Sequence, residues 1–241
     1  NHGAIGDDVV GRPIPRDDAR FVDALSPMRG HASSALPATP FFLGAAVNPF
    51  KRVERDLVPQ YAKLALKARM GARFAITQVG YDARKLDELS RFVADEDLSL
   101  RLLANVFVLT RTTARMFHAG EIPGIAIPDS LLDIAEREAA SPDQGKSFFL
   151  DLAARQVAIA RGLGYAGAYI GGTGRAQDFA AVLDRAAAFG PDDWRTFARE
   201  DAWAMPGTFS LSKEDRASGL NGSARASRGR TRRVPLAFEF L

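Results

Sequence analysis

The stretch GARFAITQVGYD, residues 71–82, determines how the rest of the chain is interpreted. Residues 71–78 are almost wholly apolar, which is typical of a buried strand, and Gln78 stands where that strand ends. Gly71 fits the stop of a preceding helix, because glycine readily adopts the left-handed conformation that closes helices. The role of an amide at the end of a buried strand depends on where that strand end lies in the fold, so the neighbouring segments must be considered.

Three further apolar runs resemble this one, and each is followed by a helical pattern. They are residues 41–46, 100–110 and 165–172. Near-continuous apolar strands that alternate with helices are typical of parallel βα units. The predicted fold class is therefore α/β, and both a doubly wound sheet and part of a (β/α)₈ barrel satisfy the pattern. In either fold, ligands bind at the carboxyl ends of the strands.

The chain divides into three regions by composition. Residues 1–40 are irregular, residues 41–204 carry the βα units, and residues 205–241 lose periodicity. The last region contains a basic run at 225–233 without an acid, which fits a solvated tail or a contact with an acidic or phosphate-bearing partner. Nucleic acid is the less favoured partner, because no aromatic residues interleave for base stacking.

Composition excludes several classes of function. The 241 residues include no cysteine, which excludes disulfides, thiolate metal sites and a cysteine nucleophile. The three histidines, His2, His31 and His118, form no metal-binding pair, so no metal site is predicted. No apolar run approaches the ~20 residues that span a bilayer, and no signal-peptide pattern opens the chain. The expected location is the cytoplasm.

Polar residues follow each predicted strand. Asn48, Gln78 and the pair 110–111 follow the first three strands, and the glycine loop 170–175 with Arg175 follows the fourth. Each can be interpreted either as a strand end or helix cap, or as a residue that contacts a ligand. Because the four positions converge on one rim of the sheet, ligand contact is favoured. Glycines before a helix N-terminus also suit a phosphate, although a tight βα turn explains the loop equally well. The residues alone specify no reaction.

Four of these segments together resemble the methylenetetrahydrofolate reductase family, which comprises flavin-dependent (β/α)₈ barrels. The segments are FFLGAAVNP, LALKARMGARFAITQVGYD, IPGIAIPDSLL and GYAGAYIGGTGR. The resemblance covers residues 41–185 and implies the C-terminal portion of the (β/α)₈ TIM barrel. It also implies a reaction in which NAD(P)H reduces FAD, and reduced FAD converts 5,10-methylenetetrahydrofolate to 5-methyltetrahydrofolate.

The resemblance assigns roles to five residues. Lys67 matches a lysine that contacts the FAD phosphates, Gln78 a glutamine that binds the folate pterin, and Arg175 an arginine that contacts the folate. Asp7, in IGDD, matches an aspartate that hydrogen-bonds the pterin and tunes the flavin. Asn48 stands where many members carry a tyrosine near the flavin.

The catalytic glutamate of the family belongs to a first strand that has no counterpart in this chain. A half barrel exposes two strand edges, which proteins ordinarily avoid. Three expectations follow: the chain is a fragment, which the missing initiator methionine favours; a complementing chain supplies the other half; or two copies pair. The alternatives to the reductase are a non-catalytic subunit that completes a barrel and a barrel enzyme for a phosphorylated substrate.

Overall fold

The computed structural model describes residues 42–224, and every structural statement below concerns that part of the chain. The irregular segment 1–40 and the arginine run 225–233 lie outside the described residues, so the interpretations placed on them stay predictions. Asp7 lies outside them as well.

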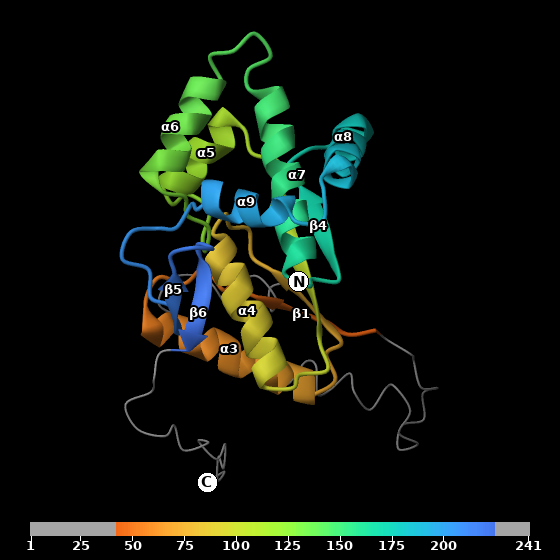
Figure 1. Ribbon diagram of the computed structural model, residues 1–241, viewed down its shortest axis with the longest axis vertical. Helices are drawn as coiled ribbons and strands as arrows, with labels where there is room; N and C mark the ends of the chain where they lie inside the picture. Colours follow the sequence, from red (N-terminus) through yellow and green to blue (C-terminus); the bar gives the residue numbers. More distant parts are fainter. Residues whose placement is uncertain (1–41, 225–241) are drawn as a thin grey trace.

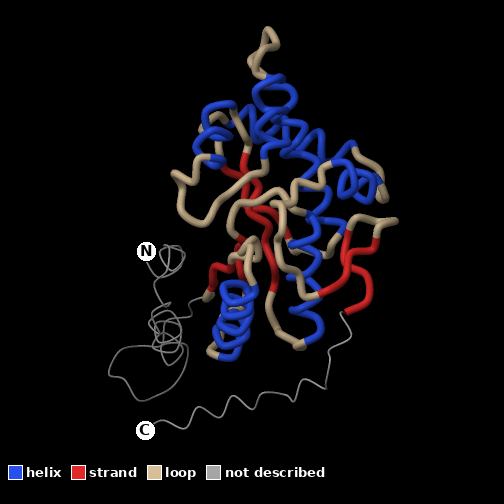
Figure 2. The backbone as a smooth tube through the Cα atoms, turned by 90° about the vertical axis from the view of Figure 1, so that its left-hand side faces the viewer, coloured by secondary structure: helices blue, strands red, loops and turns tan. Residues whose placement is uncertain are grey.

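A parallel sheet of four strands forms the centre of the protein, as the sequence predicts (Figures 1 and 2). The strands are β1 (Gly44–Val47), β2 (Phe74–Thr77), β3 (Arg101–Phe107) and β4 (Gly167–Gly171). They lie in the order β1-β2-β3-β4, so neighbours in sequence are neighbours in space. Within the described residues β1 and β4 are both edge strands. A doubly wound sheet reverses its strand order at a switch point, and no reversal occurs among these four strands.

The helices fill the connections between the strands. They are α3 (Glu54–Arg69), α4 (Ala83–Asp95), α5 (Arg111–His118), α6 (Asp129–Glu138), α7 (Lys146–Gly162), α8 (Ala176–Ala188) and α9 (Asp193–Glu200). Crossovers between parallel strands are right-handed, so strands that advance in one direction place all their crossover helices on one face of the sheet. A barrel wall has this arrangement; closure into a barrel stays a prediction.

The alternation of side chains on β3 shows the difference between the two faces. Leu102, Ala104 and Val106 are buried and belong to the main core, on the face that the helices cover. Leu103 and Phe107 point to the opposite face and are only half-buried. We call this second face the open face; its members on the four strands are Gly44, Ala46, Phe74, Ile76, Arg101, Leu103, Asn105, Phe107, Gly167, Tyr169 and Gly171.

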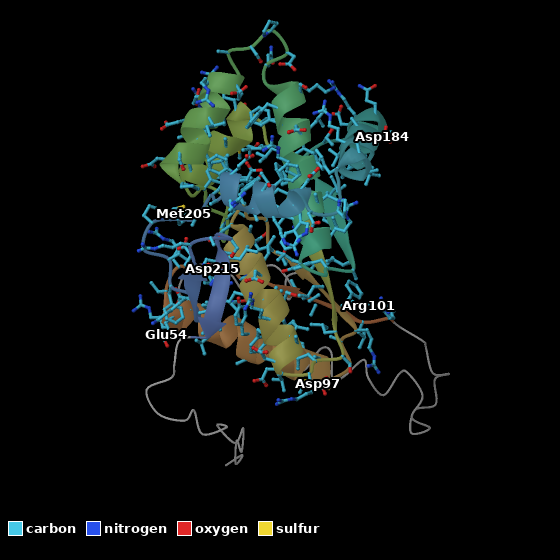
Figure 3. The ribbon with its side chains drawn as sticks, viewed as in Figure 1. Glu54, Asp97, Arg101, Asp184, Met205 and Asp215 are labelled. Carbon is cyan, nitrogen blue, oxygen red and sulfur yellow. The ribbon has the colours of Figure 1, made fainter. Side chains whose placement is uncertain are left out.

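The region from residue 205 onward is partly regular, which the sequence analysis did not predict. An antiparallel hairpin of β5 (Ser212–Asp215) and β6 (Leu220–Ala224) lies against α4 (Figure 1). Figure 3 labels Met205, in the connection from α9, and Asp215, the last residue of β5. Arg84 on α4 holds the hairpin by donating to the Ser212 carbonyl at 2.7 Å and to the Asn221 side chain at 3.2 Å. The hairpin therefore forms through contacts with α4 rather than through local strand propensity.

Across residues 42–224, the structure contains no helix with the length and apolar character needed to span a membrane.

Candidate functional site

A cavity of about 480 Å³ lies along the free edge of β1, between α3 and the open face. Pockets that hold small molecules and cofactors typically have about 300–1,000 Å³. Its lining comes from β1, α3 and the other three strands and consists of Gly44, Ala45, Ala46, Val47, Asn48, Gln60, Lys63, Lys67, Phe74, Ile76, Thr77, Gln78, Asn105 and Tyr169. Three of the five residues to which the resemblance assigned roles line this cavity: Asn48, Lys67 and Gln78.

The β1 edge contributes backbone groups to the cavity. The carbonyls of Leu43 and Val47 accept hydrogen bonds from β2, from Arg73 N at 2.8 Å and Gln78 N at 2.8 Å. Backbone groups of alternate residues in a strand point to opposite sides, so those of Gly44 and Ala46 turn toward the free edge. An N–H or C=O group at such an edge is available to a ligand or to another strand.

The α3 wall supplies positive charge. Gln60, Lys63 and Lys67 occur at helical spacing and share the face of α3 that lies along the cavity. Lys67 is buried and is one of the residues that line the cavity. Two lysines and no aspartate or glutamate are among the described residues that line this cavity.

Gln78 occupies the strand-end position that its sequence predicts. Its backbone N–H donates a hydrogen bond to Val47 O, which fixes the end of β2 against β1. Its side-chain Oε1 accepts a hydrogen bond from Val79 N at 2.9 Å, which fixes the orientation of the amide. Within residues 42–224 the Nε2 group makes no hydrogen bond, so two donors of an oriented amide lie in the wall of the cavity.

Asn48 has a structural role in addition to its place in the lining. Its Nδ2 donates to the Gly124 carbonyl at 3.1 Å, and its Oδ1 accepts from Phe50 N at 2.9 Å. The side chain is fully buried. It therefore ties the loop after β1 to the loop before α6, and its polar atoms are already engaged.

The loop after β4 is a tight turn closed by a carboxylate. Thr173 Oγ1 donates to Asp178 Oδ2 at 2.8 Å, and Lys146 Nζ lies 2.8 Å from Asp178 Oδ1. These two contacts, that of Lys146 first, lower the pKa of Asp178. Gly172 has φ +86°, and a Cβ there would lie 2.5 Å from Val108 O. An acidic side chain thus already occupies the position near the start of α8 where a phosphate would bind.

Arg175 lies outside the cavity. It is the N-cap residue of α8, its backbone N–H donates to Thr173 Oγ1 at 3.2 Å, and its side chain is exposed. The structure consequently does not bring Arg175 together with Gln78 in one lining, and its predicted folate contact stays a prediction.

The sequence analysis missed Asn105 and Tyr169, which both line the cavity. The run LRLLANVFVLT is predominantly apolar, and Asn105 is the polar residue at its centre. The position of Asn105 within the strand indicates that its side chain points away from the core, because it shares a face with Leu103 and Phe107 rather than with the buried core residues. Tyr169 gives a similar signal, because it lies on β4 between Gly167 and Gly171 on the same face of the strand.

Comparisons with known proteins do not assign a family. A scan against protein-family models and a search of the curated proteins found no match. Among solved structures, the chain is similar to a protein from Clostridium thermocellum described as an uncharacterized protein that binds two copies of 5-methyl-5,6,7,8-tetrahydrofolic acid. The sequence identity is 13%, the TM-score is 0.43, and the alignment covers 70% of this chain and 67% of that chain. A likeness of this size carries no conclusion about activity, so the resemblance to the methylenetetrahydrofolate reductases stays a prediction.

Proposed function

We propose that the cavity beside β1 binds a flavin nucleotide and a reduced folate, and that the chain takes part in the NAD(P)H-dependent reduction of 5,10-methylenetetrahydrofolate to 5-methyltetrahydrofolate. The observation that carries the proposal is the meeting of Gln78, at the carboxyl end of β2, with Lys67 in one cavity. The sequence resemblance supports the choice of ligands.

The donor set of the cavity suits such ligands. Flavin nucleotides and folates combine a planar heterocycle that has polar edges with an anionic tail. Ala46, Phe74 and Ile76 offer apolar surface, and Gln78 offers amide hydrogens for a ring edge. Lys63 and Lys67 lie on the same cavity and would attract a phosphate or carboxylate tail. Ring recognition and charge recognition are thus combined in one cavity.

The described residues would position ligands rather than transfer protons. The flavin supplies the hydride chemistry when it is bound. Gln78 would orient the ring that it contacts, since its amide is held by Val79 N, and the α3 lysines would fix the tail. No carboxylic acid lines the cavity within residues 42–224, so a carboxyl proton donor would have to come from outside this lining.

A second candidate function is a non-catalytic subunit whose sheet is completed by another chain. The specific observation is that β1 and β4 both end the described sheet and that its open face carries half-buried apolar side chains. A chain that runs at monomer size in sedimentation experiments, alone and in extracts of its source, would contradict this candidate.

Binding of FAD and of 5-methyltetrahydrofolate to the 241-residue chain tests the proposed function. We expect both to bind, and we expect Lys67→Gln to weaken FAD and Gln78→Ala to weaken the folate by about tenfold, the effect of one lost hydrogen bond to a charged or oriented group. Lys213→Gln, on exposed β5, is the matched control and should leave both affinities unchanged. A wild-type chain that is folded by circular dichroism and binds neither ligand would refute the proposal.

A further inference from the structure

One polar side chain stands within the apolar part of the open face. Asn105 lies on β3 between Leu103 and Phe107, the next two side chains on the same face, and both neighbours are apolar. Its register partner on β4 is Tyr169. Adjacent strands lie about 4.8 Å apart, so the two side chains leave the sheet side by side, and both line the cavity.

The Asn105 amide is positioned but has no partner in the described part of the chain. Its backbone N–H donates to Thr77 Oγ1 at 3.0 Å, which ties β3 to β2 at this point. Its side-chain oxygen and nitrogen make no hydrogen bond with any residue from 42 to 224. The polar atoms of this half-buried amide remain accessible at the cavity, so a ligand with matching donors and acceptors would replace the water that they otherwise bind.

Tyr169 offers a ring face next to that amide. Its side chain is 57% exposed, which is unusual for a large aromatic residue on the face of a sheet. The next residues on the same face of β4 are Gly167 and Gly171, which have no side chains to cover the ring. Aromatic rings in such positions stack on planar heterocycles.

We propose that Asn105 and Tyr169 recognise the ring of the bound heterocycle: Asn105 hydrogen-bonds its lactam edge, and Tyr169 stacks on its face. This inference rests on the proposed function and specifies the ring chemistry at the same cavity. An asparagine amide presents one acceptor and two donors, which complement the adjacent C=O and N–H of a lactam such as those in isoalloxazine and 4-oxopteridine rings. The lysines on α3 recognise charge and do not distinguish one ring from another.

Replacing Asn105 by aspartate tests the hydrogen-bond pattern. A carboxylate only accepts hydrogen bonds, so it would repel a lactam carbonyl and favour a ring that presents amino groups. The probes are lumiflavin, which carries the lactam and no phosphate, and 2,4-diaminopteridine. We expect Asn105→Asp to weaken lumiflavin at least tenfold and to tighten 2,4-diaminopteridine, as measured by ligand fluorescence in titrations of the 241-residue chain. Asn105→Ala should weaken both ligands.

Substitutions of Tyr169 test the stacking. Tyr169→Phe should keep lumiflavin affinity within about twofold, and Tyr169→Ala should lose about tenfold. Leu183→Ala removes an equally exposed apolar side chain, on α8 and outside the cavity lining, and should change neither affinity.

The outcomes separate this inference from the proposed function. Wild-type protein that binds neither FAD nor folate refutes the proposed function. Wild-type protein that binds lumiflavin, with Asn105→Asp and Tyr169→Ala variants that are folded and bind both probes equally well, overturns the inference and leaves the proposed function standing. An inverted ring preference in Asn105→Asp supports the inference, because a general loss of structure would weaken both probes.

Discussion

Replacement of Glu88 by glutamine should be one of the most destabilising isosteric changes in the described part of the chain. Glu88 lies on α4 and is buried, and its Oε1 contacts the ammonium of Lys85, which is buried as well. The same oxygen accepts a hydrogen bond from Tyr61 Oη at 3.0 Å, and Oε2 accepts from Leu211 N at 2.6 Å. One carboxylate thus joins α4, α3 and the segment that leads into the β5–β6 hairpin.

The expected loss follows from the charges that the substitution leaves behind. Removal of one partner of a buried ion pair costs about 3–5 kcal/mol, because the remaining charge stays buried without compensation. Lys85 would keep only the Phe209 carbonyl at 3.2 Å and the more distant Asp82. The glutamine amide would also direct N–H groups toward Leu211 N, which is itself a donor. For a chain of this size, such a loss lowers Tm by roughly 6–20 °C.

A pH signature distinguishes this mechanism from general damage. Burial lowers the pKa of Lys85, and Glu88 opposes that shift, so the pKa should fall further in the variant. A lysine whose folded pKa lies below its unfolded value binds fewer protons in the folded state, and stability then rises with pH toward the unfolded pKa. The difference in unfolding free energy between wild type and Glu88→Gln should therefore shrink between pH 7 and pH 10.

Urea denaturation followed by circular dichroism measures these differences. Glu136→Gln is the matched control: Glu136 bridges Arg111 and Arg115 at the surface, where water screens such pairs and they contribute little to stability. Lys85→Met in the Glu88→Gln background should recover much of the loss, because it removes the uncompensated charge. A loss below about 1 kcal/mol for Glu88→Gln, or no recovery in the double variant, would refute the reasoning.

Two further predictions concern α7 and its neighbours. Burial raises the pKa of Asp201 to about 6, so the folded state binds its proton more tightly than the unfolded state, and stability should fall as pH rises from about 4 to 6. Asp201→Asn should remove that fall and stabilise the protein by about 2 kcal/mol at pH 7 in urea titrations, whereas exposed Asp192→Asn should not. A Cβ on Gly162 would lie 2.1 Å from the Trp194 ring, so Gly162→Ala should cost about 1–3 kcal/mol. Trp194→Leu in that background should restore part of the loss, and additive losses would contradict the predicted overlap.

The strands and most helices could be predicted because their patterns are local. Each strand is a short apolar run next to a helix with a regular apolar stripe, and parallel strands buried on one face need no distant information to be recognised. Gln78 was found by the same reasoning, since the carboxyl end of a parallel strand is where a ligand meets the sheet. Gln78 and Lys67 both line the cavity.

The β5–β6 hairpin could not be predicted, because its stabilising contacts are distant in sequence. The strands SKED and LNGSA are polar and carry no strand signal. Asp87 on α4 accepts from the backbone N–H of Asn221 at 2.9 Å, and Asn221 Nδ2 donates to the Arg84 carbonyl at 2.7 Å. These partners lie more than 130 residues away in sequence, so the local pattern of α4 does not indicate them.

The open face explains why the two interpretations of the chain, a ligand-binding reductase and a subunit that completes a sheet, meet at the same residues. Right-handed crossovers place the helices on one side, so anything that covers the sheet must approach from the side of Asn105 and Tyr169. A partner chain that only filled the sheet would favour apolar side chains there. The Asn105 amide has no partner among residues 42–224 and lies beside an exposed tyrosine, with two lysines on the adjoining edge. This arrangement instead favours a polar, anionic ring ligand, and a covering chain would then serve to exclude water from it.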